Sequence, residues 1–530
     1  MSLKLAVPSP EQSTLAPVET RPKQVAEWLE RLPMANLLDA SRAVRDALSA
    51  LNRHKIDEDT RLKLLELYRA TATELVHGME AQFAGTALPL PEKQRQIAIL
   101  TRELLVELAY GYKIIVLEDA SKRISFGANK QLPLILQRAL SGLSWILVIC
   151  YQTYSPTPAG IWSELHQLYR HALQQNIQEE EVSDTGASSS VNLTYKQALM
   201  LSLADPYRLM QGDVSHILEY LAHFGDQAHL MPLAQPSSPN GFFLVRLDND
   251  KPPKALSQGL GDADARSDVL LNTLDLARTM HQKIQQLEAG EPPHSLGLPQ
   301  NAKDPAYLNL LRRLLRHWGV TPKRHFTRVP NQANVDICSG LRSVHYFMNG
   351  EKHYATGEAM ESHDAEITVK YTSSPIDKSS QQTYTSSKWV IANESAGGIA
   401  LSKASIEPVQ VRVGELIGLR PEKGQEWNVG VVRWVQSDSP TDIELGVQML
   451  APSALPVVVK PTIAPDEALF QPALMLPELP ILKQPATLVA PRGTYQDQRE
   501  LQVVNNGIAS AVRVTKLLEQ TATFEIMQFE

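Results

Sequence analysis

The fold of the C-terminal half of this chain is decided by the stretch Lys388-Trp389-Val390-Ile391-Ala392-Asn393-Glu394-Ser395-Ala396-Gly397-Gly398-Ile399-Ala400-Leu401. Apolar runs lie on both sides of a short polar segment that ends in paired glycines. Asn, Ser and Gly dominate tight turns because of their local hydrogen bonds and their tolerance of unusual backbone angles. The stretch therefore predicts two β-strands joined by a hairpin turn.

Further strand-like segments surround this hairpin. Apolar and polar residues alternate, with turn residues between the segments, and this pattern is typical of antiparallel strands. The segments are Asn334-Val335-Asp336-Ile337, the alternating Val409, Val411 and Val413, Gly430-Val431-Val432-Arg433-Trp434, and Glu444-Leu445-Gly446-Val447-Gln448-Met449.

Two arginines, Arg324 and Arg328, lie four positions apart in the loop Arg324-His325-Phe326-Thr327-Arg328. A guanidinium group can pair with the O6 and N7 acceptors of guanine, stack on a base or bind a phosphate. Two guanidinium groups on one loop can clamp a ligand that carries two guanines and two phosphates. Taken alone, such a pair is typical of a solvated helix face, and the polar segment around Ser395 is typical of a simple turn.

Together, and in this order, the two motifs resemble the RxxxR and [D/N]xSxxG signatures of the PilZ family, bacterial β-barrels that bind cyclic di-GMP. The resemblance covers about 130 residues, from near Pro322 to Leu450. It implies that cyclic di-GMP is the ligand, with no further cofactor. The glycines would allow backbone N–H groups to approach an anion closely. The implied ligand-binding residues are Arg324, Arg328, Asn393, Ser395, Gly397 and Gly398.

Trp434, at the end of a predicted strand, is a further candidate. Its side chain either fills the barrel core, which we favour, or stacks on a guanine. The sequence also departs from the family pattern, because the second motif begins 65 positions after Arg328 (393 − 328). This gap is longer than is usual in the family, and the additional residues form an insertion between about Ser339 and Ser387. An insertion there can cover the ligand site or change the number of ligands bound.

Composition limits the class of protein. A formal charge of −7 argues against a general affinity for nucleic acid or anionic membranes. The two cysteines, Cys150 and Cys338, fit a reducing cytoplasm and offer no zinc-ligand spacing. The N-terminus lacks the long apolar run of a signal peptide. The most apolar stretch, Leu132 to Cys150, is interrupted by polar residues and predicts a buried core helix rather than a transmembrane segment.

The predicted fold is a multidomain α+β protein. A mostly helical N-terminal region precedes a PilZ-like antiparallel β-barrel and a small C-terminal β-rich domain. The predicted parts are a disordered N-terminus (1–22), a helical domain (23–178), a linker (179–192), a second helical region (193–319), the barrel (320–455) with its insertion near 339–387, and the C-terminal domain (456–530). Within 193–319 only Phe242-Phe243-Leu244-Val245 is predicted to form a strand.

The sequence carries no P-loop, GxSxG or HExxH motif and none of the GGDEF or EAL signatures, so we predict no catalytic residues. His166 and His171 are better explained as core or surface residues than as metal ligands. The cluster His353, Glu358, Glu361, His363 and Asp364 lacks a metal-ligand spacing and favours a solvated loop. No sustained 34-residue period supports a helical repeat array.

Two functional hypotheses remain. The first is a cytoplasmic receptor that binds cyclic di-GMP and passes the signal through its helical region to a protein effector. The resemblance implies motility, pilus function, polysaccharide production or biofilm control as the process. The second is a scaffold protein whose barrel is structural and whose helical region binds partners constitutively.

Overall fold

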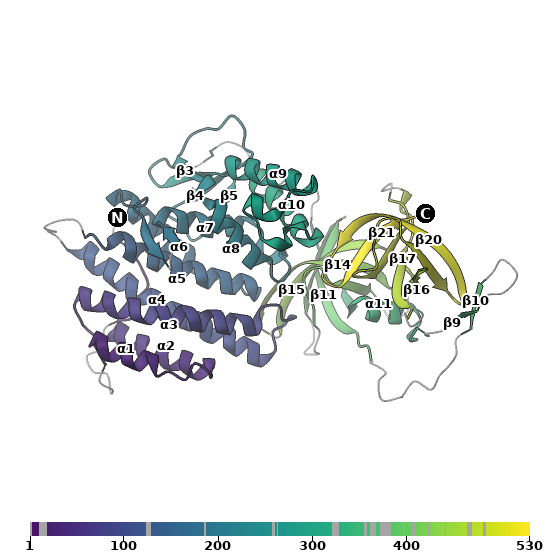
Figure 1. Cartoon of the computed structure of the whole chain (residues 1–530), viewed down its shortest axis with the longest axis horizontal. Coiled ribbons are helices and arrows are strands. Elements are labelled where there is room, and N and C mark those ends of the chain that lie inside the picture. Colours follow the sequence, from purple (N-terminus) through teal and green to yellow (C-terminus); the bar gives the residue numbers. More distant parts are fainter. Residues whose placement is uncertain are drawn as a thin grey trace. The chain divides into compact units, whose positions relative to one another are not determined.

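The structure is a computed structural model, drawn in Figure 1. It describes residues 3–9, 18–122, 129–184, 187–256, 260–261, 263–320, 328–354, 358–360, 367–370, 383–395, 397–403, 410–421, 425–439, 441–463, 469–480 and 484–530. The chain divides into two compact units. The helical unit is Met1–Thr86 with Leu90–Lys323, and the β unit is Ala87–Pro89 with Arg324–Glu530.

The helices of the helical unit pack around one apolar core. Its α-helices are α1 (Pro22–Glu30), α2 (Leu37–Arg53), α3 (Glu58–Phe83), α4 (Glu92–Ser121), α5 (Leu132–Gln152), α6 (Ile161–Gln175), α7 (Val191–Leu203), α8 (Asp213–Phe224), α9 (Leu274–Glu288) and α10 (Pro305–Gly319). Short 3-10 helices lie at η1 (Pro206–Arg208), η2 (Gly225–Gln227), η3 (Pro293–Leu296) and η4 (Gln300–Lys303). Apolar residues at helical spacing form this core: on α3, Leu65, Tyr68, Ala72, Leu75 and Met79 are all buried.

Helix α5 lies in the middle of this unit and packs against α4, α6 and α7. It is long and apolar enough to cross a membrane, but 78% of its most apolar window is buried inside the protein. The neighbouring helices therefore cover the apolar surface that lipid would otherwise have to cover. The prediction of a buried core helix is confirmed.

A four-stranded antiparallel sheet also belongs to the helical unit, where the sequence predicted a single short strand. Its strands are β3 (His229–Pro232), β4 (Phe242–Arg246), β5 (Lys254–Ala255) and β6 (Asp268–Asn272), in the order β3-β6-β4-β5. The strand β6 occupies a stretch predicted to be helical. Because β6 pairs with β3 on one edge and β4 on the other, tertiary pairing outweighs its local preference.

The segment 179–192, predicted as a flexible linker, contains a small hairpin instead. Its strands are β1 (Val182–Asp184) and β2 (Ala187–Ser189). Ser190 caps the following helix, because its Oγ accepts a hydrogen bond from the Leu193 N–H at 3.0 Å. The helices before and after this hairpin share one core, so the predicted regions 23–178 and 193–319 form a single unit.

The N-terminal residues also differ from the prediction of disorder over 1–22. Residues Leu3–Ser9 lie against the helical unit, and Leu5 is only 8% exposed. Residues 1–2 and 10–17 lie outside the described part of the chain.

The β unit begins with an antiparallel barrel, the middle barrel. Its strands are β7 (Val329–Pro330), β8 (Asn334–Ser339), β11 (Ser387–Ser395), β12 (Gly398–Lys403), β13 (Leu416–Arg420), β14 (Asn428–Ser439) and β15 (Asp442–Ala451). Their order is β12-β15-β14-β13-β8-β11-β7, and the pairing of β12 with β11 closes the sheet. The predicted strands around Ile337, Trp434 and Val447 are confirmed. Of the predicted strand with Val409, Val411 and Val413, Val409 lies outside the described residues, and Val411 forms only an isolated bridge.

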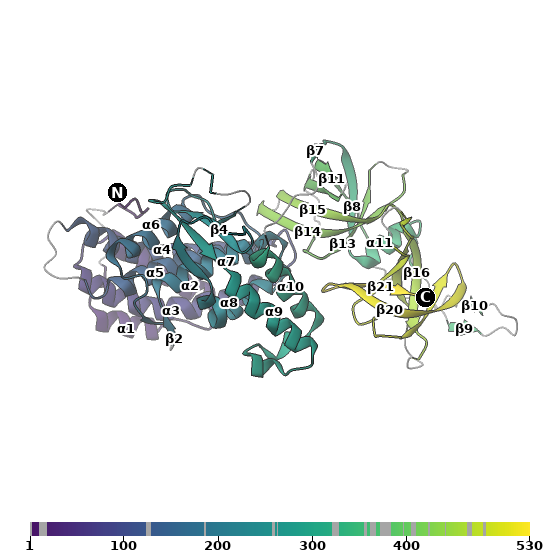
Figure 2. The ribbon, with the colours of Figure 1, turned by 90° about the horizontal axis from the view of Figure 1, so that it is seen from above.

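A second barrel, the C-terminal barrel, follows. Its strands are β16 (Leu455–Pro461), β17 (Gln471–Leu476), β18 (Thr487–Pro491), β19 (Glu500–Asn505), β20 (Ile508–Gln520) and β21 (Phe524–Phe529), and β19 pairs with β20 to close it. The predicted C-terminal β-rich region is therefore confirmed as a closed sheet. Figure 2 shows β16, β20 and β21 beside the strands of the middle barrel.

The insertion contributes to the second barrel. It contains α11 (Leu341–Met348), β9 (Glu358–Met360) and β10 (Ile367–Lys370), and β10 extends the C-terminal sheet by pairing with β20. Helix α11 packs against β8 and β13 of the middle barrel and against β16 and β17 of the C-terminal one. Residues of α11 and of both barrels form one apolar cluster, so the two barrels share a core. Among the described residues, no predicted ligand-binding position lies in this cluster.

A short segment from the helical half of the sequence belongs to the β unit. Ala87–Pro89 lies between α3 and α4 in sequence, yet it is part of the β unit. The Leu88 N–H donates to the Val411 carbonyl at 3.0 Å, and the Val411 N–H donates to the Leu88 carbonyl at 2.8 Å. Both side chains are 1% exposed. The chain therefore passes between the two units at 86/87, at 89/90 and at 323/324.

His166 is fully buried on α6 and has two polar partners. Its Nε2 lies 2.9 Å from the Lys251 carbonyl and its Nδ1 lies 2.6 Å from the Tyr195 hydroxyl. Because a carbonyl can only accept, Nε2 carries a proton. Burial lowers the pKa of His166 to about 4 and so favours the neutral ring, in which Nδ1 accepts from the Tyr195 hydroxyl. Of the two explanations that the sequence left open, core or surface, the structure shows that His166 is a core residue.

We expect this histidine to make the helical unit sensitive to acid. The unfolded chain takes up the proton near the ordinary pKa of about 6.5, whereas the folded chain resists it down to about 4. The stabilisation is thus fully present above 6.5 and is lost as pH falls towards 4, by roughly 2–4 kcal/mol. Denaturant unfolding can be followed by helical circular dichroism at several pH values. As the pH falls, the free energy of unfolding should decrease less for His166→Gln than for the parent. The exposed control His77→Gln should follow the parent, and parallel profiles for all three proteins would contradict the assignment.

Candidate nucleotide-binding face of the middle barrel

The polar motif forms a tight hairpin between β11 and β12. Ser395 pairs with Gly398, so only Ala396 and Gly397 lie between the strands. The Ser395 hydroxyl donates to the Gly398 carbonyl at 3.1 Å and holds the turn closed. Ser395 is half-buried and Gly397 is exposed. The turn therefore presents short polar groups and exposed backbone at one end of the barrel.

The arginine motif ends beside this hairpin. Strand β7 pairs with the other edge of β11, with Val329 opposite Glu394 and Pro330 opposite Asn393. Continuing this register by one residue brings Arg328 level with Ser395, one strand spacing of about 4.8 Å away. The two motifs, far apart in the sequence, are thus neighbours in the sheet. Arg324 lies outside the described residues.

Arg328 itself is exposed. Within the part of the chain that the structure describes, its guanidinium has no hydrogen-bonding or ionic partner. An arginine in this state loses no protein contact when it binds a ligand, and its five N–H donors are available.

Cross-strand register places four of the barrel's residues in one row. Asn393 pairs with Ala400, Ala400 pairs with Gly446, and Gly446 pairs with Trp434. Directly paired residues lie on the same face of a sheet, whereas their chain neighbours lie on the other. The adjacent row, Leu401, Leu445 and Val435, is fully buried. The row from Asn393 to Trp434 therefore lies on the outer face of the barrel.

Trp434 is half-buried and does not belong to the core, contrary to the expectation that it fills the barrel. A β-bulge between Val432 and Trp434 shifts the alternation, which turns Trp434 to the outer face. Its indole lies across the backbone of Gly446, where a Cβ would come within 1.8 Å of Nε1. Sequence reasoning missed Gly446, although a glycine within a predicted strand is a signal for such a close approach.

The structure shows why position 398 must be a glycine, which the sequence did not reveal. A Cβ at this position would lie 2.1 Å from the Val447 carbonyl oxygen of β15. The glycine thus allows β12 and β15 to pair closely. Any larger residue would disturb the barrel itself, so a Gly398→Val substitution does not test the predicted approach to an anion.

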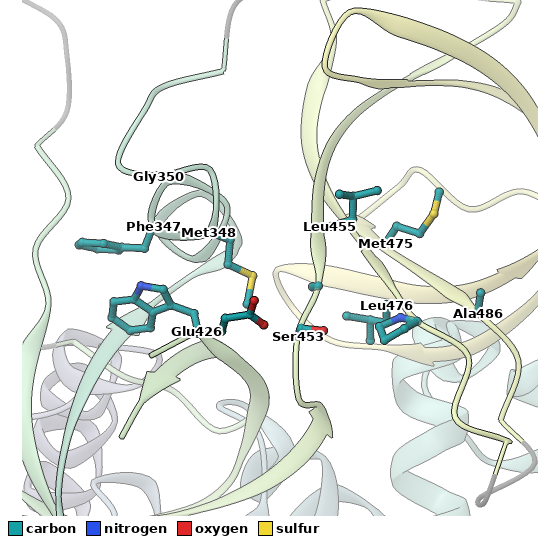
Figure 3. A pocket seen from close by; sticks show the side chains of 12 residues that line it. Phe347, Met348, Gly350, Glu426, Ser453, Leu455, Met475, Leu476 and Ala486 are labelled. Atoms are coloured by element: carbon teal, nitrogen blue, oxygen red, sulfur yellow. The ribbon is translucent and has the colours of Figure 1, made fainter. Parts of the chain in front are cut away.

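A cavity of about 590 Å³ lies elsewhere in the β unit, between α11 and the two barrels. Figure 3 shows Phe347 and Met348 of α11 on one side of it and Leu455 and Met475 on the other. Its wall is mainly apolar, and its one carboxylate, Glu426, would repel a phosphate. None of the row residues lines it. The outer face beside Arg328 has the better chemistry for an anionic nucleotide.

The histidine and acidic cluster of the insertion falls mostly outside the described side chains. Only His353 can be placed, and its ring lies 4.9 Å from that of Tyr346 and 5.7 Å from that of Tyr384. Over the described residues, no group of three or more His, Cys, Asp or Glu side chains is arranged to hold a metal ion.

Comparison with known proteins covers nearly the whole chain. Residues 23–235 match the family model described as "Cyclic-di-GMP receptor FimW, N-terminal domain". Residues 242–371 and 356–456 match "Cyclic-di-GMP receptor FimW, middle PilZ domain", and residues 457–530 match "FimW C-terminal beta-barrel domain". A curated relative from Pseudomonas aeruginosa, "Cyclic-di-GMP receptor FimW", is 27% identical over an alignment that spans 100% of this chain and 93% of the relative. This chain therefore belongs to the PilZ-domain family, as a bacterial member with a long helical N-terminal region and a second β-barrel.

Proposed function

We propose that this protein is a cytoplasmic receptor that binds cyclic di-GMP on the outer face of its middle barrel. Its helical unit then passes the signal to a protein partner in motility, pilus function, polysaccharide production or biofilm control. The observation that carries the proposal is the register of β7, β11 and β12, which brings Arg328 beside Ser395. The names of the matching family and of the relative support the same ligand.

The ligand's chemistry fits this face. Cyclic di-GMP carries two phosphates and two guanines, and an arginine can pair with a phosphate or with a guanine edge. Arg324 and Arg328 form the clamp. Asn393 and Ser395 offer short hydrogen-bonding groups, and the exposed backbone at Gly397 allows close approach. The contribution of Gly398 is indirect, because it lets β12 pair closely with β15.

Trp434 lies at the other end of the row, three strands from Asn393. Three strand spacings correspond to about 14 Å along the sheet. A guanine stacked on its indole would therefore be a different base from the one held by Arg328. A two-fold ligand, or a second copy of it, offers such a base.

We infer that the signal passes through the points at which the chain crosses between the two units. Besides the junction after α10, the segment Ala87–Pro89 joins the β unit to the ends of α3 and α4. A change in the barrel can thus act on the helical unit at two separate places in the sequence. A partner that recognises the helical surface would sense this change.

The arginine clamp can be tested by calorimetric titration of the full chain with cyclic di-GMP. We expect Arg324→Ala and Arg328→Ala each to weaken binding by about 1.5–3 kcal/mol, or roughly one to two decades in Kd, because each removes a charge-assisted contact. The control is Arg342→Ala, an exposed arginine on α11, which packs on β8, β13, β16 and β17. It should bind like the parent. A parent chain that binds no nucleotide would favour the alternative scaffold function.

Trp434 is tested by a pair of conservative variants. Trp434→Phe should leave the melting temperature of the β unit nearly unchanged and weaken cyclic di-GMP binding, because stacking on an aromatic ring contributes about 1–3 kcal/mol per base. Trp389→Phe is the matched control, since Trp389 is fully buried in the barrel. That change should lower the melting temperature. If Trp434→Phe melts early and binds normally, Trp434 supports the fold and does not contact the ligand.

Hydrogen exchange with and without cyclic di-GMP tests the route of the signal. We expect altered protection in the middle barrel, at the ends of α3 and α4 that flank Ala87–Pro89, and at the end of α10. Peptides from α1 and α2 should not change, and Arg328→Ala should abolish the effect at the same nucleotide concentration. Changes confined to the barrel would remove this route and leave the receptor function standing.

A further inference from the structure

The segment Leu3–Ser9 lies against α6 in an extended arrangement. Its burial alternates: Leu5 is buried and Leu3 and Val7 are half-buried, whereas Lys4 and Ala6 are exposed. This period of two is typical of an extended chain with one face on a surface. Leu5 is the anchor, because it belongs to the apolar core of the helical unit. Figures 1 and 2 both show the N-terminal end of the chain beside α6.

Side chains of α6 bind the backbone of this segment. The Gln167 amide binds both backbone polar groups of Lys4. Its Oε1 accepts from the Lys4 N–H at 2.7 Å, and its Nε2 donates to the Lys4 carbonyl at 3.2 Å. The Glu164 Oε1 accepts from the Ala6 N–H at 2.6 Å. These polar contacts thus use backbone groups, and every residue except proline can supply the N–H donors.

The groups that make these contacts are held in place by the protein. The second carboxylate oxygen of Glu164 is paired with the Lys113 ammonium at 2.8 Å, and the side chains of Lys113 and Glu164 are 3% and 11% exposed. Gln167 is held by a hydrogen bond to the Ser163 hydroxyl at 3.1 Å. The Glu164 carboxylate and the Gln167 amide are thus held in position to bind the N–H and carbonyl groups of an extended backbone.

We propose that this surface of the helical unit, formed by Lys113, Glu164, Gln167 and the apolar site of Leu5, is a binding groove for an extended peptide of a partner protein. The Leu3–Ser9 segment is its intramolecular occupant. The partner segment carries a leucine, or a similar apolar residue, with non-proline residues on both sides. The groove belongs to the helical unit, and the proposal does not depend on nucleotide binding.

The intramolecular occupant controls access to the groove. Because the segment is covalently attached, it competes with a free peptide at an effective concentration on the order of millimolar. A partner therefore binds well only after the segment has left, or when it presents its own peptide at comparable local concentration. Loss of the Leu5 anchor should open the groove.

Fluorescence anisotropy with a labelled peptide of residues 1–9 tests the proposal. The proteins are the full chain, a chain lacking residues 1–9, and the full chain with Leu5→Asp. We expect the second and third to bind the peptide at least about tenfold more tightly than the first, because their groove is not filled from within. Helical circular dichroism and the melting temperature establish that each protein is folded.

Variants of the peptide distinguish recognition of the backbone from recognition of side chains. Lys4→Ala and Ala6→Ser peptides should bind like the parent peptide, since both side chains are exposed. Lys4→Pro and Ala6→Pro peptides lack a donor and should bind roughly tenfold more weakly or worse. A Leu5→Asp peptide should not bind.

Three outcomes would overturn the proposal. The first is a folded, shortened chain that does not bind the peptide, and the second is equal binding by the full and the shortened chains. The third is unfolding of the helical unit in both the shortened chain and the Leu5→Asp variant. In that case the segment is an inseparable part of the core and not a replaceable ligand.

Discussion

The strand register of the middle barrel is the constraint on which the proposed site depends. Because side chains alternate between the two faces of a sheet, a slip of one residue would move Asn393 and Trp434 to the inner face and Leu401 and Leu445 outward. The close approach of Gly398 to the Val447 carbonyl and the bulge before Trp434 fix this register. Two features that look like details of packing thus decide which residues a ligand can reach.

The sequence predicted the fold best where local chemistry and tertiary environment agree. The hairpin around Ser395 was read correctly because turn residues lie between apolar runs, and α5 was read correctly because polar residues interrupt its apolar stretch. The family resemblance was confirmed because two motifs and their order matched together. In these places the physical signal lies within a short window of sequence.

Prediction failed where long-range contacts decide the structure. Strand β6 is held by two partners that its own sequence does not reveal, and the run of serines before α7 serves as strand and helix cap instead of linker. The outward position of Trp434 depends on one bulged residue, which alternation alone cannot locate. The insertion resembled a loop, yet α11 supplies part of the core shared by the two barrels. The ligand contacts themselves stay predictions.

The segment Ala87–Pro89 has a consequence for how the protein is made. A ribosome releases it long before Val411, so the early residues must wait for a strand partner that is still to be synthesised. Closing so long a stretch of chain costs entropy, which delays contacts between distant parts of a sequence. The bridge can therefore form only after the chain of α4 to α10, which lies between its two residues in sequence, has been synthesised.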